Sequence, residues 1–488
     1  MTWQKGIGLE EKWAFPPQAE RIYSLVFYRG QYGEAQGDGG NKDKAEKGEG
    51  PKEDQNVAEK RDCLAELPEP LLHHILSCLT MKDVIRTSVL AKRWRYIWLY
   101  VPCLTFSPLK KTKAEEEAFI TRSLILHKGP QVQKLNITFT YSTEALLIDS
   151  WIQFALSRNV NQLYLDFRSR YYSTAFKTRI HDIVFSCSSL TELTLKGCRI
   201  ELPVKIKLGS LKTLSFEEVK VRGAVNNLLA SCPILEDLSF ADCYLKRNHV
   251  LVIGNSSVKT LKIEGGYLSG NLTLEIHAPF IVSIELIIEL SSESYIIKRM
   301  ESLCSARSVC SKSGACHEQG DTIFSNLEYL RHVKDLGMCS CYIQAMSSIE
   351  NPTQDCREKH IMDFISFEVT CLRIKTGLMK WELPGIAYIL SHSPNVETLI
   401  ISIDEILDDQ IEDNFQEEEY WKLQEPKFVN LLCNLKDVKI YNFMKNLSLL
   451  ESKQNNMNFL RFLLKNSMVL ERMTTTVNFR RNSKNKKS

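Results

Sequence analysis

Hydrophobic positions recur at helical spacing more densely in residues 62–106 than elsewhere in the chain. Apolar residues lie three and four positions apart across residues 67–79, which predicts an amphipathic helix. Thr80 and Asp83 form a capping pair that predicts the start of a second helix. A third helix is predicted over residues 94–101, where aromatic and aliphatic residues keep the same spacing.

Three short helices, near the lower limit of about 40 residues for independent folding, cannot enclose this much Leu, Ile and Trp. Part of that apolar surface must therefore face another protein or the following domain. On pattern alone, a helical cap on a larger domain is an equally good interpretation.

Strand patterns dominate the chain after residue 114, where a unit of short helix, turn and Leu-x-x-Leu-x-Leu strand recurs. The central strand leucines are Leu163, Leu193, Leu214, Leu238 and Leu261, with gaps of 30, 21, 24 and 23 residues. These periods are in or near the range of leucine-rich repeats, in which neighbouring units stack and share one core. Alternation along each strand directs the leucines inward and the intervening residues outward. The outward positions are Thr194, Ser215, Ser239 and Lys262.

The remaining segments differ in composition. Residues 1–60 are an unassigned leader followed by a linker that is expected to be disordered, because it is poor in large apolar residues. Residues 402–425 form an acidic loop, and nine carboxylates lie between Asp404 and Glu419. A strand, a helix and a last strand are predicted within residues 426–478, and residues 479–488 form a basic tail.

Net charge, apolar runs and cysteine content indicate which classes of partner and which compartment to expect. Lys and Arg total 62 against 59 acidic residues, so the net charge of +3 predicts no nucleic-acid partner. No apolar run has the length of a membrane span, and we expect no membrane partner. Fifteen cysteines without an export signal predict reduced thiols and a location in the cytoplasm and/or nucleus.

Motifs of catalysis and metal binding are missing from the sequence. It contains no Walker loop, dinucleotide fingerprint, H-E-x-x-H or G-x-S-x-G motif. The cysteines of the Cys- and Ser-rich stretch 302–320 lack the spacing of common zinc sites. We therefore predict a protein that is not an enzyme, with no catalytic residue, no metal and no cofactor.

Three segments resemble parts of one plant protein family. Residues 61–107 resemble an F-box, through Leu67-Pro68, Leu71-Leu72-His-His-Ile75-Leu76, Val84 and Lys92-Arg93-Trp94. Residues 114–401 resemble the irregular leucine-rich repeats of plant F-box proteins, and residues 426–478 resemble the FBD domain. The implied fold class is α/β: a three-helix F-box, then a repeat solenoid that ends in an FBD-like α/β unit. Met444 and Lys445 depart from the family, which tends to have Gly there.

The resemblance implies a substrate-recognition subunit of an SCF-type, cullin–RING ubiquitin ligase. The F-box would dock a Skp-family adaptor, and through it cullin, while the repeats bind a protein substrate whose identity and contact residues are unknown. The candidate adaptor residues, some of which must instead build the core of the F-box, are Leu67, Pro68, Leu71, Leu72, Ile75, Leu76, Val84, Leu90, Lys92, Trp94 and Trp98. The alternative is a non-catalytic interaction scaffold with no role in ubiquitin transfer.

Overall fold

The structure, a computed structural model, divides the chain into two compact units, Met1–Val101 and Pro102–Ser488. The predicted leader, most of the Cys- and Ser-rich stretch, nearly all of the acidic loop, Met444 with Lys445 and the basic tail lie outside the described residues. The described residues are 67–90, 92–109, 112–141, 144–168, 176, 178–245, 250–265, 273–288, 294–297, 300–310, 327–350, 366–403, 420, 432–443 and 450–476.

The first unit contains two short α-helices and a series of 3-10 turns. Helix α2 follows Pro68, and the hydroxyl of Thr80 accepts a hydrogen bond from the backbone N–H of Asp83 (3.4 Å), which confirms the predicted start of α3. These elements are α2 (Glu69–Ser77), α3 (Met81–Arg86), η1 (Thr87–Val89), η2 (Lys92–Arg95) and η3 (Ile97–Tyr100).

The predicted third helix over residues 94–101 is wrong in its form. Two 3-10 turns, η2 and η3, replace it, and Tyr96 between them leaves the helical region at φ −122° and ψ −3°. Trp, Tyr and Ile are weak helix formers, and short 3-10 turns let their large side chains reach the core at a different spacing.

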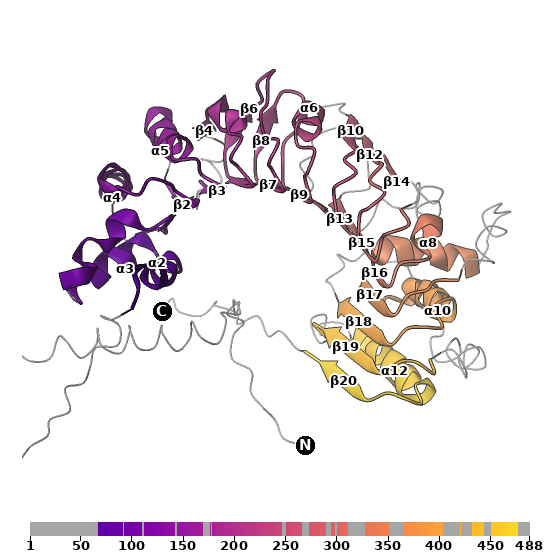
Figure 1. Cartoon of the computed structure of the whole chain (residues 1–488). Helices are drawn as coiled ribbons and strands as arrows, with labels where there is room; N and C mark the ends of the chain where they lie inside the picture. The colour runs from indigo at the N-terminus through magenta and orange to yellow at the C-terminus, as the bar shows by residue number, and fades with distance from the viewer. Residues whose placement is uncertain are drawn as a thin grey trace, which may run out of the picture. The chain divides into compact units, whose positions relative to one another are not determined.

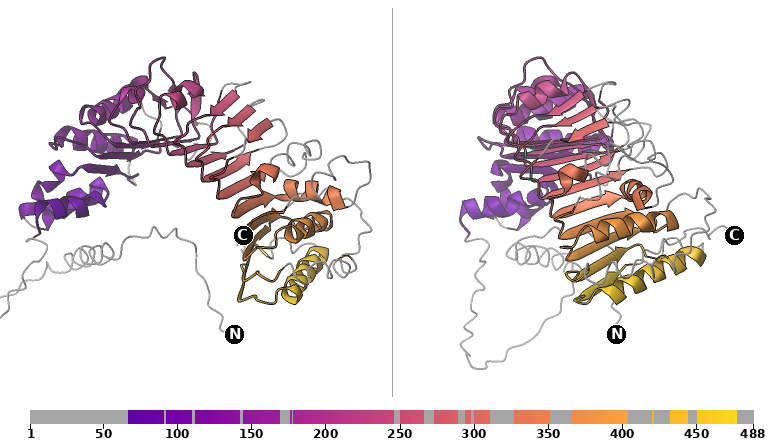
Figure 2. Two further views of the ribbon diagram at one scale, coloured as in Figure 1. Left: turned by 45° about the vertical axis from the view of Figure 1, so that its right-hand side comes forward. Right: turned by 90° about the vertical axis from the view of Figure 1, so that its right-hand side faces the viewer.

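A fourteen-stranded parallel sheet forms the second unit, in the order β1-β2-β3-β5-β7-β9-β11-β13-β15-β16-β17-β18-β19-β20. Figures 1 and 2 show these strands side by side, with helices along one side of the sheet. The strands of this sheet are β1 (Cys103–Phe106), β2 (Lys134–Thr138), β3 (Gln162–Asp166), β5 (Glu192–Lys196), β7 (Thr213–Glu217), β9 (Asp237–Ala241), β11 (Thr260–Glu264), β13 (Ser283–Ile288), β15 (Ser305–Cys310), β16 (Asp335–Cys339), β17 (Cys371–Thr376), β18 (Thr398–Ile403), β19 (Asp437–Tyr441) and β20 (Arg472–Thr475).

Helices and short strands connect the strands of the main sheet. Two further three-stranded parallel sheets form from β4 (Arg179–Ile180), β6 (Arg199–Glu201) and β8 (Lys220–Arg222), and from β10 (Val250–Ile253), β12 (Thr273–Ile276) and β14 (Ser294–Ile297). The helices are α4 (Lys113–Leu126), α5 (Ala145–Ser157), η5 (Asp182–Ser186), α6 (Val225–Ala230), α8 (Ser340–Glu350), η7 (Lys380–Glu382), α10 (Leu383–Ser391) and α12 (Leu450–Asn466). No helix in the described ranges is long and apolar enough to cross a membrane.

The register confirms the repeat predicted from the sequence. Leu163, Leu193, Leu214, Leu238 and Leu261 are paired at one level across β3, β5, β7, β9 and β11. They are buried against the helix side, whereas the residue after each one points to the opposite face, here called the strand face. The same row continues through Leu399, Val438 and Met473, so the C-terminal strands β19 and β20 extend the same sheet.

Ten cysteines of the described residues are free, in line with the expectation of reduced thiols. Cys198, Cys232 and Cys243 are free and buried among the repeats. Cys341, near the start of α8, is disulfide-bonded, so the expectation is wrong at this position.

Candidate partner-binding surfaces

The predicted adaptor residues divide into a buried and an exposed group in the first unit. Leu72, Leu76 and Val84 have no exposed side-chain surface, and Trp94 is 2% exposed. They pack with Ile97 and Val101 in a single core cluster. These four side chains therefore build the core of the folded unit, as the sequence analysis expected of some of the candidates.

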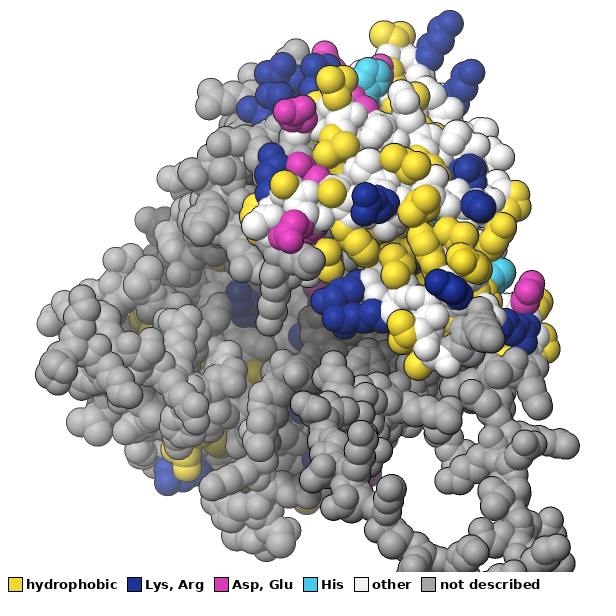
Figure 3. All heavy atoms as spheres, turned by 90° about the vertical axis from the view of Figure 1, so that its left-hand side faces the viewer, with side chains coloured by type: hydrophobic (Ala, Val, Ile, Leu, Met, Phe, Trp, Pro, Cys, Tyr) yellow, Lys and Arg dark blue, Asp and Glu magenta, His cyan; other side chains and the backbone are white. Residues whose placement is uncertain are grey.

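Three other predicted residues reach the surface. Leu71 is 52% and Leu90 39% exposed, and Pro68 is exposed at the start of α2. Val89 is 85% exposed and Tyr96 is also exposed, although the sequence analysis did not select them. In Figure 3, which has the side of the molecule with α2 and α3 toward the viewer, hydrophobic side chains gather next to Lys and Arg.

Of the last four predicted residues, three have partly buried side chains, and the burial of the fourth is not described. Leu67 and Trp98 are partly buried against the core cluster, and Ile75 is half-buried on α2. Lys92 lies in η2, and its side chain is outside the described part of the structure. The first unit thus has a filled core and an apolar surface, as the predicted surplus of hydrophobic residues requires.

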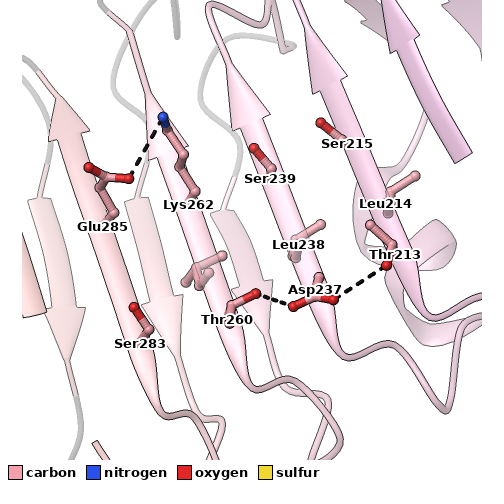
Figure 4. Close-up of a pocket in the computed structure, with 11 residues that line it drawn as sticks. Thr213, Leu214, Ser215, Asp237, Leu238, Ser239, Thr260, Lys262, Ser283 and Glu285 are labelled. Atoms are coloured by element: carbon pink, nitrogen blue, oxygen red, sulfur yellow. Dashed lines mark hydrogen bonds and ion pairs between the residues drawn. The ribbon is translucent and has the colours of Figure 1, made fainter. Parts of the chain in front are cut away.

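The strand face of the second unit carries a hollow of about 210 Å³ over β7, β9, β11 and β13 (Figure 4). Small outward side chains, Ser215 and Ser239, form its floor, because hydroxyls at these positions leave space that larger residues would fill. Lys262 and Glu285 border it on one side, with 3.7 Å between Nζ and Oε2.

Asp237 is the acidic group of this hollow on β9. Its carboxylate accepts a hydrogen bond from the hydroxyl of Thr213 (3.3 Å) and a second one from the hydroxyl of Thr260. No Lys or Arg of the described residues forms an ion pair with Asp237. The arrangement therefore offers a fixed negative charge, with hydroxyls on both sides, to a cationic or hydrogen-bonding group of a partner.

A row of alternating charges continues across the strand face beyond the hollow. Arg307 lies 3.9 Å from Glu285 and 3.7 Å from Asp335, and Asp335 forms a bidentate pair with Arg373 (2.8 and 3.1 Å). The hydrogen bonds that Arg373 donates to Asp335 raise the pKa of Arg373. Each charge in this row already has a partner, so these residues stabilise neighbouring strands and leave the hollow as the better candidate for binding.

A second charged group lies toward the other end of the strand face. Arg168 donates to Asp166 (2.8 Å) and pairs with Glu217 (2.5 Å), and Lys196 also reaches Glu217 (2.6 Å). The hydrogen bond with Asp166 raises the pKa of Arg168. Like the preceding row, this group is internally balanced.

The described residues contain no group of three or more His, Cys, Asp or Glu side chains that could hold a metal ion. Burial raises the pKa of Cys232 and of Cys243 to about 12, which keeps both thiols protonated and unreactive. The surfaces described above are suited to binding.

Two sequence profiles of known domains match this chain. A sequence profile of the F-box domain matches residues 64–106, and a profile described as "At1g61320/AtMIF1, LRR domain" matches residues 124–488. The F-box/LRR-repeat protein At3g26922 of Arabidopsis thaliana is 32% identical over 256 residues, which cover 50% of this chain and 81% of that protein.

Two further relatives carry the FBD domain in their names. The F-box/FBD/LRR-repeat protein At5g56420 of Arabidopsis thaliana is 28% identical over 399 residues, covering 70% of this chain and 92% of the relative. The F-box/FBD/LRR-repeat protein At2g04230 of the same plant is 31% identical over 276 residues, covering 53% of this chain and 60% of the relative.

Proposed function

This chain belongs to the plant family of F-box/LRR-repeat proteins, and from that premise we propose that it is the substrate-recognition subunit of an SCF-type, cullin–RING ubiquitin ligase. F-box domains in general bind Skp-type adaptors, and proteins of this family are typically non-catalytic. In our proposal the first unit docks a Skp-family adaptor, which links the chain to cullin in the cytoplasm and/or nucleus, and the repeats bind a protein substrate.

The observation that carries the proposal is the exposed apolar surface of an F-box whose core is already filled. Leu71, Val89 and Leu90 expose much of their side chains although Leu72, Leu76 and Trp94 occupy the interior. Burying exposed Leu or Val in an interface is favourable by roughly 1.5–3 kcal/mol each. An adaptor groove that covers these side chains would supply the missing apolar contacts.

The chain would contribute proximity to the ligase and no bond-making chemistry of its own. Holding a substrate lysine near the charged ubiquitin carrier raises the effective concentration of the reacting groups. The substrate surface in this proposal is the strand face around the hollow, where the carboxylate of Asp237 forms no ion pair among the described residues. We expect a substrate segment that brings a Lys or Arg side chain to this carboxylate.

The test for adaptor docking uses the full chain co-expressed with a Skp-type adaptor. Leu71→Asp combined with Leu90→Asp places two charges on the proposed interface, because both side chains are exposed. Because the double variant loses two apolar anchors, we expect its affinity for the adaptor to fall by roughly a hundredfold or more. Calorimetry or co-purification measures this loss.

The matched control is Ile125→Asp on α4, a residue of the second unit that is 76% exposed. It introduces the same charged side chain at an exposed apolar position and should leave the adaptor affinity unchanged. An unmutated chain that fails to bind the adaptor would remove the proposal. Adaptor binding without any change in the lifetime of captured proteins would favour the interaction scaffold.

A further inference from the structure

The small sheet of β4, β6 and β8 places like charges side by side. Its register pairs Arg179 with Arg199 and Arg199 with Lys220, so three cations occupy directly opposed positions on adjacent strands. Figure 1 shows this sheet between α5 and α6, on the side of the main sheet that carries the helices. Like charges directly opposed across strands are destabilising, so the row has an energetic cost in the free protein.

The exposed face of this sheet also contains a hollow of about 90 Å³, lined by Arg179, Arg199, Glu201, Arg222 and the backbone side of Ile200. Glu201 is the acidic member, and Arg179 already holds it at 3.2 Å. The side chains of Arg199 and Arg222 form no hydrogen bond or ion pair within the described part of the chain. As far as the described residues are concerned, two guanidinium groups therefore keep their donors available at one small opening.

The backbone beneath this hollow is firmly held. Ile180, Ile200 and Val221, which directly follow Arg179, Arg199 and Lys220 along their strands, are buried on the inner face of the sheet. The backbone N–H of Leu202 donates to the carbonyl of Arg222 (2.8 Å), and Gly223 then turns the chain at φ +108°. A substituent at Gly223 would meet Cβ of Leu202 at 3.0 Å, so the close approach of the two strands needs glycine.

The second small sheet shows that cations are no requirement of this architecture. In β10, β12 and β14 the corresponding rows are Val250–Thr273–Ser294 and Val252–Glu275–Ile296. None of these six residues is Lys or Arg. Strand pairing in a small sheet of this kind therefore does not require the cations of β4, β6 and β8.

We propose that this hollow, here called the arginine pocket, binds a phosphate monoester carried by a partner protein. Arg presents a fork of donors that matches phosphate oxygens in a bidentate way, and a phosphate group brings about two negative charges and three acceptor oxygens. A carboxylate has two oxygens, which one guanidinium satisfies, whereas Arg199 and Arg222 together offer more donors than that.

The small volume of the arginine pocket and the clustering of its cations favour a single phosphorylated side chain over a polyanion as the ligand. Nucleic acid and anionic membranes are bound by cations spread over a broad surface. Here the cations surround one opening of about 90 Å³, in a chain whose net charge is only +3. The opening is on the surface, so a peptide chain attached to the phosphate can continue outside it. The assignment does not depend on the ligase role.

The test measures binding of the full chain to a fluorescein-labelled peptide that carries one phosphoserine among Gly and Ser residues. Arg199→Gln with Arg222→Gln removes the free donors, and we expect the affinity for this peptide to fall by about tenfold or more in fluorescence anisotropy. Glu201→Gln removes the one carboxylate in the pocket and should raise the affinity by roughly threefold. A residue with a purely structural role would not produce this gain.

The matched control is Lys205→Gln with Lys207→Gln, which removes two exposed cations from the loop after β6 without touching the pocket lining. This variant should keep its affinity within about twofold, because screened charges outside the pocket contribute little. The melting temperature of each variant checks its folding. Loss of the opposed charge in Arg199→Gln should leave that temperature unchanged or higher.

The outcomes separate the sources of phosphate. Preference for the phosphorylated over the unphosphorylated peptide, with inorganic phosphate a weaker competitor, supports a partner protein. Competition by inorganic phosphate as strong as that of the peptide would overturn the assignment to a protein-borne group. Equal losses in the arginine and lysine variants would overturn the pocket itself, because they would show unspecific attraction.

Discussion

Glu382 shows at the residue scale how a buried charge can organise a connection between repeats. Its carboxylate accepts hydrogen bonds from the hydroxyls of Ser340 and Thr376 (2.9 Å for the latter) and from the backbone N–H groups of Gly377 (3.1 Å) and Met379 (3.0 Å). Ser340 begins α8, whereas Thr376 ends β17 and the backbone donors Gly377 and Met379 follow it. One side chain thereby joins the start of a helix to the loop of the next repeat.

We expect Glu382→Ala to lower the free energy of unfolding by about 3 kcal/mol, because it leaves several buried donors without an acceptor. Urea unfolding of the full chain measures the change. Glu397→Ala is the control: Glu397 is exposed and pairs with Lys436 at 3.2 Å, so its loss should cost no more than about 0.5 kcal/mol. Equal effects of the two substitutions would contradict the role assigned to Glu382.

The pH dependence of this contribution has a definite sign. Burial raises the pKa of Glu382 above its ordinary value of 4.5, although the hydrogen bond from Ser340 and those from the loop oppose the shift. The folded state then binds a proton more readily than the unfolded state. The stabilisation is complete below pH 4.5 and declines as pH rises through the folded pKa. Unfolding of the wild type and Glu382→Ala across this range should show a shrinking difference; a growing one would refute this.

The repeat strand is the element on which the fold of the second unit depends. Leu238 on β9 pairs with Leu214 and Leu261 on the neighbouring strands, and its side chain is 1% exposed. The next residue, Ser239, points to the strand face. Inner residues of stacked repeats stabilise both the repeat that contains them and the contact with its neighbours.

Leu238→Ala should therefore destabilise the chain by about 3 kcal/mol, since it leaves a cavity at the centre of the leucine row. Ser239→Ala on the same strand should change stability by less than about 0.5 kcal/mol. Denaturant midpoints of the two variants provide the measurement. A larger effect at Ser239 than at Leu238 would mean that the two faces of the sheet have been assigned incorrectly.

At the scale of the whole molecule, a long parallel sheet needs a unit that covers its last strands. Helix α12 buries Phe459, Phe462 and Leu463, and β20 pairs with β19 along four residues. Together they cover the inner side chains Val438 and Ile440 of β19. Solenoids need such terminal units, because an uncovered last repeat exposes both apolar surface and an unpaired strand edge.

A chain that ends after Tyr441 should consequently aggregate and melt at a lower temperature than one that ends after Thr476. The longer chain keeps α12 and β20, and both chains lack the basic tail, so the comparison isolates the terminal unit. Size-exclusion chromatography and thermal unfolding record the two effects. A shorter chain that remained monomeric and equally stable would show that β19 can end the sheet unaided.

Local sequence pattern predicted much of this fold. The five central leucines of β3 to β11 were found from alternation and spacing alone, because a strand has a period of two and stacked repeats keep a common register. The start of α3 at Thr80 was predicted for a similar reason, since a cap depends on residues three positions apart. The plant family and the full domain order were instead identified from the resemblance of motifs such as Leu67-Pro68 to the F-box, and the comparisons confirm that family.

Tertiary structure alone decided which apolar residues of the first unit face inward and which side chains of distant strands meet. Leu71 and Leu72 are equally apolar neighbours, and only packing places Leu72 in the core and leaves Leu71 exposed. The arginine pocket likewise unites Arg179, Arg199 and Arg222 from three strands whose pairing is non-local. Local sequence thus determines features that depend on nearby residues, such as helix caps and strand alternation. Contacts between distant segments depend on the packing of the whole unit.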